Sequence, residues 1–452
     1  MPWRAASGRL AATPSTRNSP RQSGRRSGLA DPPRAADEGP IMSVAAAIEV
    51  KGWCPGVLRP MQSGDGLIAR VRPWAGAFGL AEASALADAS EVFGNGHIDL
   101  TRRANLQIRG LGETSLSGLQ DIVERHRLVD RSADAEAVRN IMVSPLAGLD
   151  PSERIDVRRL ARALESGLAA DTALHSLPSK FGFLVDGGGS VSISGERADV
   201  ALRVVGQAVA VGLDTRSGAE WIGRTSPDAA AKTALMAARV FLGVRREQRR
   251  LRDLGDEGLA HVRSVLAPLL GPLDGDLPVD RDRPLGMIPL GAGRTAVGIA
   301  AAFGRLEAHQ LRSLLAVVED AGATDIRPSP WRSLYVGARD IAAAHRVVEA
   351  ARDIGLIVEA NDPILRIDAC PGAPDCRSSS VDARRDARRF AALGFAGTLH
   401  VSGCAKGCAR STPADLVLVG EQGHYQVVRQ GTTRDAPERT VAVEEAGTLF
   451  HV

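Results

Sequence analysis

Cysteine and long apolar runs are both scarce in this chain. It has five cysteines among 452 residues, and no apolar signal segment opens it. A disulfide framework of the kind found in short secreted chains is therefore excluded. No apolar run is long enough to cross a membrane, and a net charge of +3 gives no reason to expect a nucleic acid as a partner. We expect a soluble cytoplasmic protein that binds neither membrane nor nucleic acid.

Lysine is scarce as well, and arginine supplies nearly all of the positive charge. Together with abundant alanine and glycine, this usage indicates a GC-rich coding bias more than a function. The lysines are Lys51, Lys180, Lys232 and Lys406. Their rarity gives weight to Lys180 and Lys406, which lie in two motifs described below.

The first 41 residues differ in composition from the rest. Their arginines stand among Ser, Pro, Ala and Gly, with no acidic residue before Asp31. Such a segment cannot bury an apolar face. We expect a disordered extension over residues 1–45, with Met42 as an alternative start; a transit peptide has the same composition.

Periodicity predicts alternating helices and strands from about residue 46 onward. Residues 98–109 are expected to form one strand with a kink near Arg102, and residues 181–194 a hairpin around three glycines. The other predicted elements of this half are a strand over 66–72 and helices over 80–93, 154–170 and 228–251.

After about residue 280 the pattern recurs, which indicates an internal duplication. A strand is predicted over 294–299, a helix over 306–320 and extended chain over 326–336. At an offset of 226 positions, residues 141–148 align with residues 367–374, and Lys180 falls on Lys406. Ser144 then replaces Cys370 and Asp150 replaces Cys376, so that only one copy carries these cysteines. The alternative is chance similarity between two α/β segments.

Four of the five cysteines form a C-x5-C pair followed by a C-x3-C pair: Cys370, Cys376, Cys404 and Cys408. Structural zinc sites favour tight C-x2-C pairs, which neither motif has. A [4Fe–4S] cluster needs four thiolates spread around a larger body, and loops rich in Gly and Pro suit it. The cluster is our preferred interpretation; zinc and unligated cysteines stay open. Cys54 lies far upstream, as a buried structural thiol or, less favoured, a ligand.

These cysteine motifs, the duplication and the run from Thr101 to Gln107 resemble the sirohaem-dependent sulfite and nitrite reductase superfamily. The resemblance implies an α/β (α+β) fold with two ferredoxin-like half-domains and two α/β lobes around a tetrapyrrole, with Cys408 bridging cluster and haem iron. The implied segments are half-domains over 46–115 and 280–350, a lobe without cluster cysteines over 116–250, and a cluster-binding lobe over 351–452.

The chain also departs from the reductases. They carry a Lys-x-Lys pair that grips the sulfite or nitrite anion, whereas here Gly182 stands at the second lysine after Lys180. The usual Arg-Gln pair is altered too, because Ala104 follows Arg103. We expect Gly182 to leave space over a macrocycle for oxygen chemistry instead of holding an inorganic anion.

Three stretches resemble one branch of the superfamily, the precorrin-3B synthase family of aerobic cobalamin biosynthesis. They begin at Cys54-Pro55-Gly56, at Arg139-Asn140 and at His400-Val401. The resemblance implies that precorrin-3A is hydroxylated at C20 with O2 and closes a γ-lactone. It also implies a [4Fe–4S] cluster, a mononuclear non-haem iron, and NADH as reductant through an electron donor. The alternatives are a sirohaem-dependent sulfite or nitrite reductase and a non-catalytic electron carrier.

The site predicted from these patterns has two parts. Cys370, Cys376, Cys404 and Cys408 are the metal ligands. Precorrins carry many carboxylates, which guanidinium groups bind in a bidentate way. The predicted substrate-binding residues are Arg103, Gln107, Arg139, Lys180 and Lys406. No catalytic residue is assigned, and the candidates for the mononuclear iron are His97 with Asp99, His175 and His400.

Overall fold

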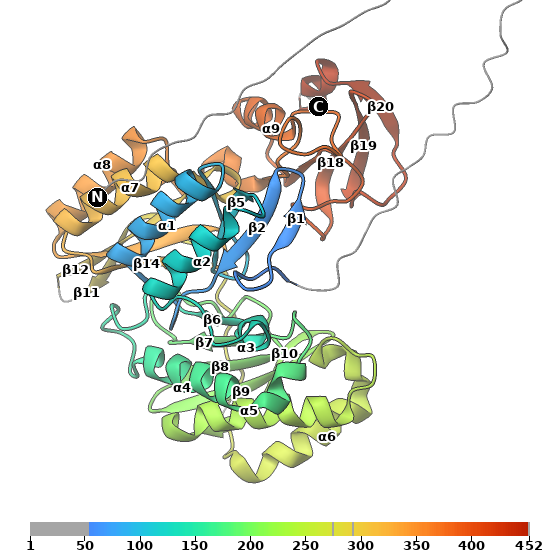
Figure 1. Ribbon diagram of the computed structural model, residues 1–452. Helices are drawn as coiled ribbons and strands as arrows, with labels where there is room; N and C mark the ends of the chain where they lie inside the picture. The colour runs from blue at the N-terminus through green and yellow to red at the C-terminus, as the bar shows by residue number, and fades with distance from the viewer. Residues whose placement is uncertain (1–53, 274, 292, 451–452) are drawn as a thin grey trace, which may run out of the picture. The chain divides into compact units, whose positions relative to one another are not determined.

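The computed structural model describes residues 54–273, 275–291 and 293–450 (Figure 1). The extension predicted for residues 1–45 and the start of the first half-domain lie outside these residues. The described chain combines α-helices with four five-stranded sheets. None of the helices in these ranges is both long and apolar enough to span a membrane.

The first half-domain is an antiparallel sheet with helices on one face. Its strands, in sheet order, are β1 (Met61–Ser63), β2 (Gly66–Val71), β5 (Leu106–Leu111), β4 (His97–Leu100) and β13 (Arg305–Glu307). Helices α1 (Leu80–Phe93) and α2 (Leu116–Arg125) contribute to the same hydrophobic core. The Glu82 carboxylate accepts from the Gly79 backbone N–H at the start of α1, and Gly94 ends the helix.

The second half-domain repeats this plan. Its strands, in sheet order, are β11 (Gly286–Gly291), β12 (Arg294–Ala300), β15 (Ser333–Ala338), β14 (Asp325–Pro328) and β3 (Phe78–Gly79). Its helices are α7 (Ala308–Asp320) and α8 (Ile341–Asp353). Each half-domain therefore contributes one short edge strand to the sheet of the other: β3 of the first joins the second sheet, and β13 of the second joins the first sheet.

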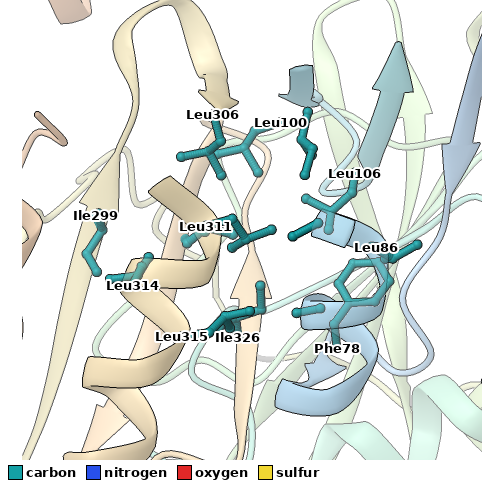
Figure 2. Close-up of a cluster of buried hydrophobic side chains, with 14 of the residues drawn as sticks. Phe78, Leu86, Leu100, Leu106, Ile299, Leu306, Leu311, Leu314, Leu315 and Ile326 are labelled. Carbon is teal, nitrogen blue, oxygen red and sulfur yellow. The ribbon is translucent and has the colours of Figure 1, made fainter. Parts of the chain in front are cut away.

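This exchange joins the two half-domains into one hydrophobic core. Phe78 on β3 and Leu306 on β13 are both at most 1% exposed. Figure 2 shows them among side chains from both copies, including Leu100, Leu106 and Leu311. Helix α2 and residues up to Val358 belong to this core too, so we propose to extend the half-domains beyond the expected ends at 115 and 350.

The two lobes also share one topology. In the first, β6 (Ile141–Val143), β7 (Phe183–Asp186) and β8 (Val200–Val205) run parallel, and β9 (Ala208–Thr215) and β10 (Gly218–Thr225) continue antiparallel. In the second, the same order is β16 (Ile367–Ala369), β17 (Leu399–Ser402), β18 (Ala414–Glu421), β19 (His424–Gly431) and β20 (Arg439–Ala442).

Helices pack on each lobe sheet. The first lobe has α3 (Ala133–Val138), α4 (Val157–Ala170), α5 (Pro227–Val244) and α6 (Gly255–Leu266), and the second has α9 (Ala383–Ala392). Ser226 caps α5 through a bond from the Ala229 backbone N–H, with Pro227 in the first turn.

The strand registers correct one detail of the predicted duplication. Ser144 follows β6 as Cys370 follows β16, which keeps the offset of 226. Phe183 pairs with Ile141, however, as Leu399 pairs with Ile367, which gives an offset of 216. The second lobe is ten residues shorter from the start of its helix to the start of the next strand. Lys180 precedes β7 while Lys406 follows β17, so the two lysines are not equivalent.

Three local predictions are also wrong. Residues 98–109 form a hairpin, β4 and β5, around a turn in which Ala104 has φ 54°. Residues 191–194 form no strand, because β7 pairs in parallel with β6 and β8 instead. Helix α5 ends at Val244, and Arg245 onward is not helical.

The exchanged strands predict a large effect of truncating Leu306. Because its side chain is 1% exposed in a core fed by both copies, we expect Leu306→Ala to lower the free energy of unfolding by about 2–5 kcal/mol. Leu269→Ala, at a position 46% exposed, is the matched control and should change it by less than about 1 kcal/mol. Urea denaturation measures both, and equal effects would contradict the shared core.

Candidate functional site

One face of the first half-domain sheet carries polar side chains from β2, β4 and β5. On β2, Ala69 and Val71 point into the hydrophobic core, so the alternating side chains point to the opposite face. The same alternation holds on β4 and β5, where Ile98, Leu106 and Ile108 are in the core. The polar face carries Arg70, Arg72, His97, Asp99, Gln107 and Arg109.

The four predicted cluster cysteines lie on two loops at the ends of parallel strands. Cys370 follows β16, and Cys404 follows β17 next to it. The Gly403 backbone N–H donates to the Cys370 Sγ over 3.0 Å. Burial raises the pKa of the Cys370 thiol, and the nearby Cys404 and Cys376 raise it further. Partial burial and the other three thiols raise the pKa of Cys408. The loops therefore bring all four thiols together.

This arrangement fits an iron–sulfur cluster. Four thiolates so close repel one another, and bound iron would offset their charge. Within the described residues, no group of three His, Cys, Asp or Glu side chains is placed to hold a single metal ion; this finding includes the four cysteines, so it does not distinguish zinc from a cluster. A Cβ on Gly403 would collide with Ser379 and approach the Cys370 Sγ to 3.4 Å. Glycine there keeps the backbone amide against the sulfur.

A buried carboxylate fixes the strand that leads to Cys370. Asp368 accepts from Arg102 over 2.7 Å, from Arg332 over 3.2 Å and from Arg410 over 3.0 Å. Burial alone would raise the pKa of Asp368, but these cations outweigh it and hold the pKa below its ordinary value. The three arginines come from the first half-domain, the second half-domain and the cluster lobe, so one carboxylate ties the three together.

The histidines predicted for a mononuclear iron have other surroundings. His97 Nδ1 lies 3.2 Å from the Arg305 guanidinium, and His97 Nε2 lies 3.4 Å from Glu307. His175 Nε2 lies 3.1 Å from the Leu168 carbonyl. His400 is fully buried with both ring nitrogens unpartnered, and burial lowers its pKa to about 4. None of these groups forms a ligand set, so the proposed histidine sites are not supported.

Asp99 is a structural anion at the cluster end of the polar face. Its carboxylate contacts Arg305 at 2.8 Å, Arg109 at 3.1 Å and Arg384 at 4.0 Å. Burial opposes its ionisation, but the charges of Arg305, Arg384 and Arg109 prevail and lower the pKa of Asp99 to about 2. Arg305 also reaches Asp375, one residue before Cys376. This network joins the sheet to the cluster loop.

The predicted substrate-binding residues divide into two groups. Gln107 lies on the polar face and accepts from Arg70 over 3.3 Å, and Arg103 donates to the Lys180 carbonyl over 2.8 Å. Both therefore belong to the first half-domain's approach to the first lobe, where Lys180 is exposed. Lys406 lies elsewhere, in the C-x3-C loop, where its Nζ is 3.3 Å from the Ser378 hydroxyl.

Arg139 is the exception. Its side chain is 3% exposed, pairs with Asp130 at 3.0 Å and donates to the Pro73 carbonyl over 3.0 Å. It also stacks on the Trp74 ring, 3.7 Å from the ring centre. These contacts give Arg139 a structural role, and the prediction that it binds substrate stays a prediction.

Sequence reasoning missed the arginines that organise the cluster side, Arg305, Arg332, Arg384 and Arg410. They come from segments with no motif, and arginine is common throughout the chain. For Arg70 and Arg72 a signal did exist, because the alternation predicted for residues 66–72 already puts them opposite Ala69 and Val71.

The first lobe has a polar network where the second has its cysteines. Ser144, the counterpart of Cys370, donates to Asp186 over 2.9 Å, and Ser192 donates to the same carboxylate over 2.7 Å. Nearby, burial raises the pKa of Glu153 to about 7, and the charges of Asp150 and Asp186 add to the effect. Hydrogen bonds among side chains thus occupy the place in this copy where the other copy has its cysteines.

Comparison with known proteins defines the class. Residues 59–126 match the nitrite/sulfite reductase ferredoxin-like half domain, and residues 134–252 match the nitrite and sulphite reductase 4Fe-4S domain. The solved NirA protein of Mycobacterium tuberculosis matches with a TM-score of 0.66 and 21% identity over 84% of this chain and 79% of that one. The fold is that of the nitrite and sulfite reductase superfamily, an α+β architecture built from two repeats.

Curated relatives narrow the class. The ferredoxin–nitrite reductase of Synechococcus elongatus is 27% identical over 81% of this chain and 78% of its own length. A precorrin-3B synthase of Sinorhizobium sp. is 32% identical over 90% of this chain and 87% of its own length. The chain therefore belongs to the precorrin-3B synthase family and is an enzyme of an oxidoreductase family. The matched 4Fe-4S domain supports an iron–sulfur cluster, although residues 134–252 hold no cysteine and the four thiols lie in the other copy.

Replacing the clustered cysteines tests this assignment. We expect Cys376→Ser to remove most of the cluster absorbance and to lower iron content well below about four atoms per chain, because one of four thiolate ligands is lost. Cys54→Ser is the matched control and should keep both. Anaerobic purification, absorption spectroscopy and iron analysis measure the outcome. Full cluster content in Cys376→Ser, or its loss in Cys54→Ser, would contradict the ligand set.

The raised pKa of Glu153 predicts that the free energy of unfolding depends on pH. The pKa of this carboxyl rises from 4.5 to about 7 on folding. Between these two pH values the group is mostly neutral in the folded state and mostly charged in the unfolded state. Stability should therefore fall as the pH rises from about 4.5 to 7, by roughly 1–3 kcal/mol, and stay low above pH 7. Glu153→Gln should flatten this part of the urea-denaturation profile, whereas Glu124→Gln, at an exposed site on α2, should not.

Proposed function

We propose that the protein is a precorrin-3B synthase, which hydroxylates precorrin-3A at C20 with O2 while the ring-A acetate closes a γ-lactone. One oxygen atom enters the product and the other leaves as water, with two electrons from NADH through an electron donor. The family membership supports this reaction directly. The alternative is a sirohaem-dependent sulfite or nitrite reductase, which the shared fold favours equally but the site residues favour less.

The surroundings of Gly182 favour the synthase over the reductase. In the reductases a second lysine is implied at this position, close to the inorganic anion. Here the Arg103 Nη1 lies 3.7 Å from where a Cβ on Gly182 would be, and the Asn140 carbonyl oxygen lies 3.3 Å from it. The Arg103 guanidinium is itself held by the Lys180 carbonyl. A small anion would therefore lack the paired lysines that neutralise its charge.

This geometry corrects the expectation that Gly182 opens space over a macrocycle. Gly182 is buried, and its backbone N–H donates to Asp199 over 2.9 Å. The position is enclosed by protein: a Cβ there would lie tightly against the Asn140 carbonyl oxygen at 3.3 Å and in ordinary contact with the Arg103 guanidinium at 3.7 Å. An arginine beside this position suits a carboxylate-rich substrate better than sulfite or nitrite.

The chain's own residues bind and orient the substrate in this proposal. The arginines and Gln107 of the polar face supply hydrogen-bond donors for the carboxylates of the tetrapyrrole, and Lys180 and Arg103 lie at the edge of that face. Cys370, Cys376, Cys404 and Cys408 would hold a [4Fe–4S] cluster, which supplies electrons singly when bound. A mononuclear non-haem iron remains part of the proposal, without assigned ligands.

The decisive experiment compares substrates. Anaerobically purified protein is assayed with precorrin-3A, O2, NADH and a donor system, and separately with sulfite and nitrite under reducing conditions. We expect the hydroxylactone product, cluster absorbance without a haem Soret band, and negligible turnover of either anion. Six-electron reduction of sulfite or nitrite by a haem-containing form would instead establish the alternative.

Lys180 provides a residue-level test of the same proposal. Removal of one cation from the substrate's carboxylates should lower kcat/KM for precorrin-3A by about tenfold in Lys180→Met, mainly through KM, because a charged hydrogen bond contributes about 1.5–3 kcal/mol. Lys232→Met, at an exposed position on α5, is the matched control and should leave kcat/KM unchanged. Equal activity of both variants would remove Lys180 from the binding site.

A further inference from the structure

A cavity of about 280 Å³ lies at the end of the polar face. It is bordered by the end of β2, by α3, and by the segment that leads to Lys180. Its lining includes Cys54, Arg59, Arg72, Glu136, His175 and Ser179. We call it the Arg72 cavity, because Arg72 has an unusual state there.

Arg72 is a buried cation without a hydrogen bond. Its side chain is 2% exposed, and none of its three guanidinium nitrogens has a partner. The closest carboxylate is Glu136, at 3.5 Å. Both oxygens of that carboxylate already accept from backbone amides, Val57 over 2.7 Å and Leu58 over 3.0 Å. A buried charged donor that makes no bond destabilises the folded protein.

The neighbouring Arg139 shows that the fold can satisfy a buried arginine at this place. Arg139 is 3% exposed and donates to the Asp130 carboxylate and to the backbone carbonyls of Pro73 and Arg72. Arg72, one residue from Pro73, has the same burial and none of these bonds. The difference points to a partner for Arg72 that is not part of the described chain.

The charge around the cavity favours an anion. Arg59, Arg72, Arg245 and Arg249 line it together with His175, against Asp134 and Glu136. Glu136 is held by the two amides. Burial lowers the pKa of Arg72 to about 10, which leaves it protonated at neutral pH.

We propose that the Arg72 cavity binds one carboxylate arm of the tetrapyrrole substrate, with the Arg72 guanidinium as its donor. This rests on the proposed function and adds a residue that determines which arm, and therefore which tetrapyrrole, is accepted. A volume of about 280 Å³ admits an acetate or propionate arm with a few waters of about 30 Å³ each, and not a macrocycle. Ser179 lines the cavity beside the exposed Lys180, so the arm would enter from the edge where Lys180 and Arg103 lie.

The test compares Arg72→Met with Arg139→Met in the cluster-containing protein. Precorrin-3A is titrated anaerobically without reductant, and tryptophan fluorescence reports its Kd; thermal denaturation of the ligand-free protein reports Tm. We expect Arg72→Met to raise Kd about 10- to 100-fold at an unchanged or higher Tm. Arg139→Met should lower Tm clearly. Arg72→Lys keeps the charge but loses the guanidinium fork, and should raise Kd less than Arg72→Met.

Two results would overturn the proposal. One is a drop in Tm for Arg72→Met as large as that for Arg139→Met with unchanged Kd, which would make Arg72 structural. The other applies if the wild-type protein does not bind precorrin-3A, a result that would by itself end the proposed function. Propionate alone is then added to the wild type: a rise in Tm that Arg72→Met abolishes supports a carboxylate site in the cavity, and the absence of such a rise overturns the cavity proposal.

Discussion

The position of the loop that begins with Cys370 depends on the carboxylate of Asp368. It lies in the middle of β16, two residues before Cys370, and accepts hydrogen bonds from arginines of both half-domains and of the cluster lobe. Buried ion pairs contribute little net stability when compared with apolar packing, but breaking one is severe because it leaves charges unpaired. The three arginines therefore fix where the cluster loop starts relative to the sheet of each half-domain.

The two copies hold the corresponding loop in different ways. Both copies end their first lobe strand at the same place, but one continues with Ser144 and the other with Cys370. In the first copy the Asp186 carboxylate accepts from two serines, and Arg327 of the second half-domain donates to the Ala147 carbonyl over 2.6 Å. In the second copy the thiols repel one another, and charge partners from outside the lobe, Arg305 on Asp375 and Arg332 on Asp368, anchor the loop instead.

Sequence patterns predicted what depends on local periodicity. Helix α1 spans Leu80–Phe93 as expected, the strand pattern of residues 66–72 corresponds to β2, and the repeated fold follows from the recurrence of these elements. The offset of 226 failed at β7 because the ten-residue difference in length between the copies leaves no trace in either motif. The hairpin at 181–194 failed because parallel pairing with distant strands overrode a local glycine turn.

Prediction from the sequence was less complete for the candidate site than for the fold. The cysteine pattern could be read from the sequence because the spacing of the thiols is a property of two loops, and their role as cluster ligands stays a prediction. The role of each arginine could not be predicted from the sequence, because it depends on which acceptors the fold places around the guanidinium group. Arg139 donates hydrogen bonds to Asp130 and two carbonyls, whereas Arg72, close by and equally buried, has only the Glu136 carboxylate at 3.5 Å and no hydrogen bond.

A protein that can satisfy Arg139 but leaves Arg72 without a bond retains a destabilising feature that packing alone would remove. Natural sequences keep such features where activity requires them. On the polar face Arg70 shares this feature in part, because its Nε is buried without a partner while its Nη2 donates to Gln107. Arg70 on β2 and Arg72, the residue after its end, thus hold guanidinium groups available to an anion. Their alternation with Ala69 and Val71 means that the segment which builds the shared core also presents donors for a substrate.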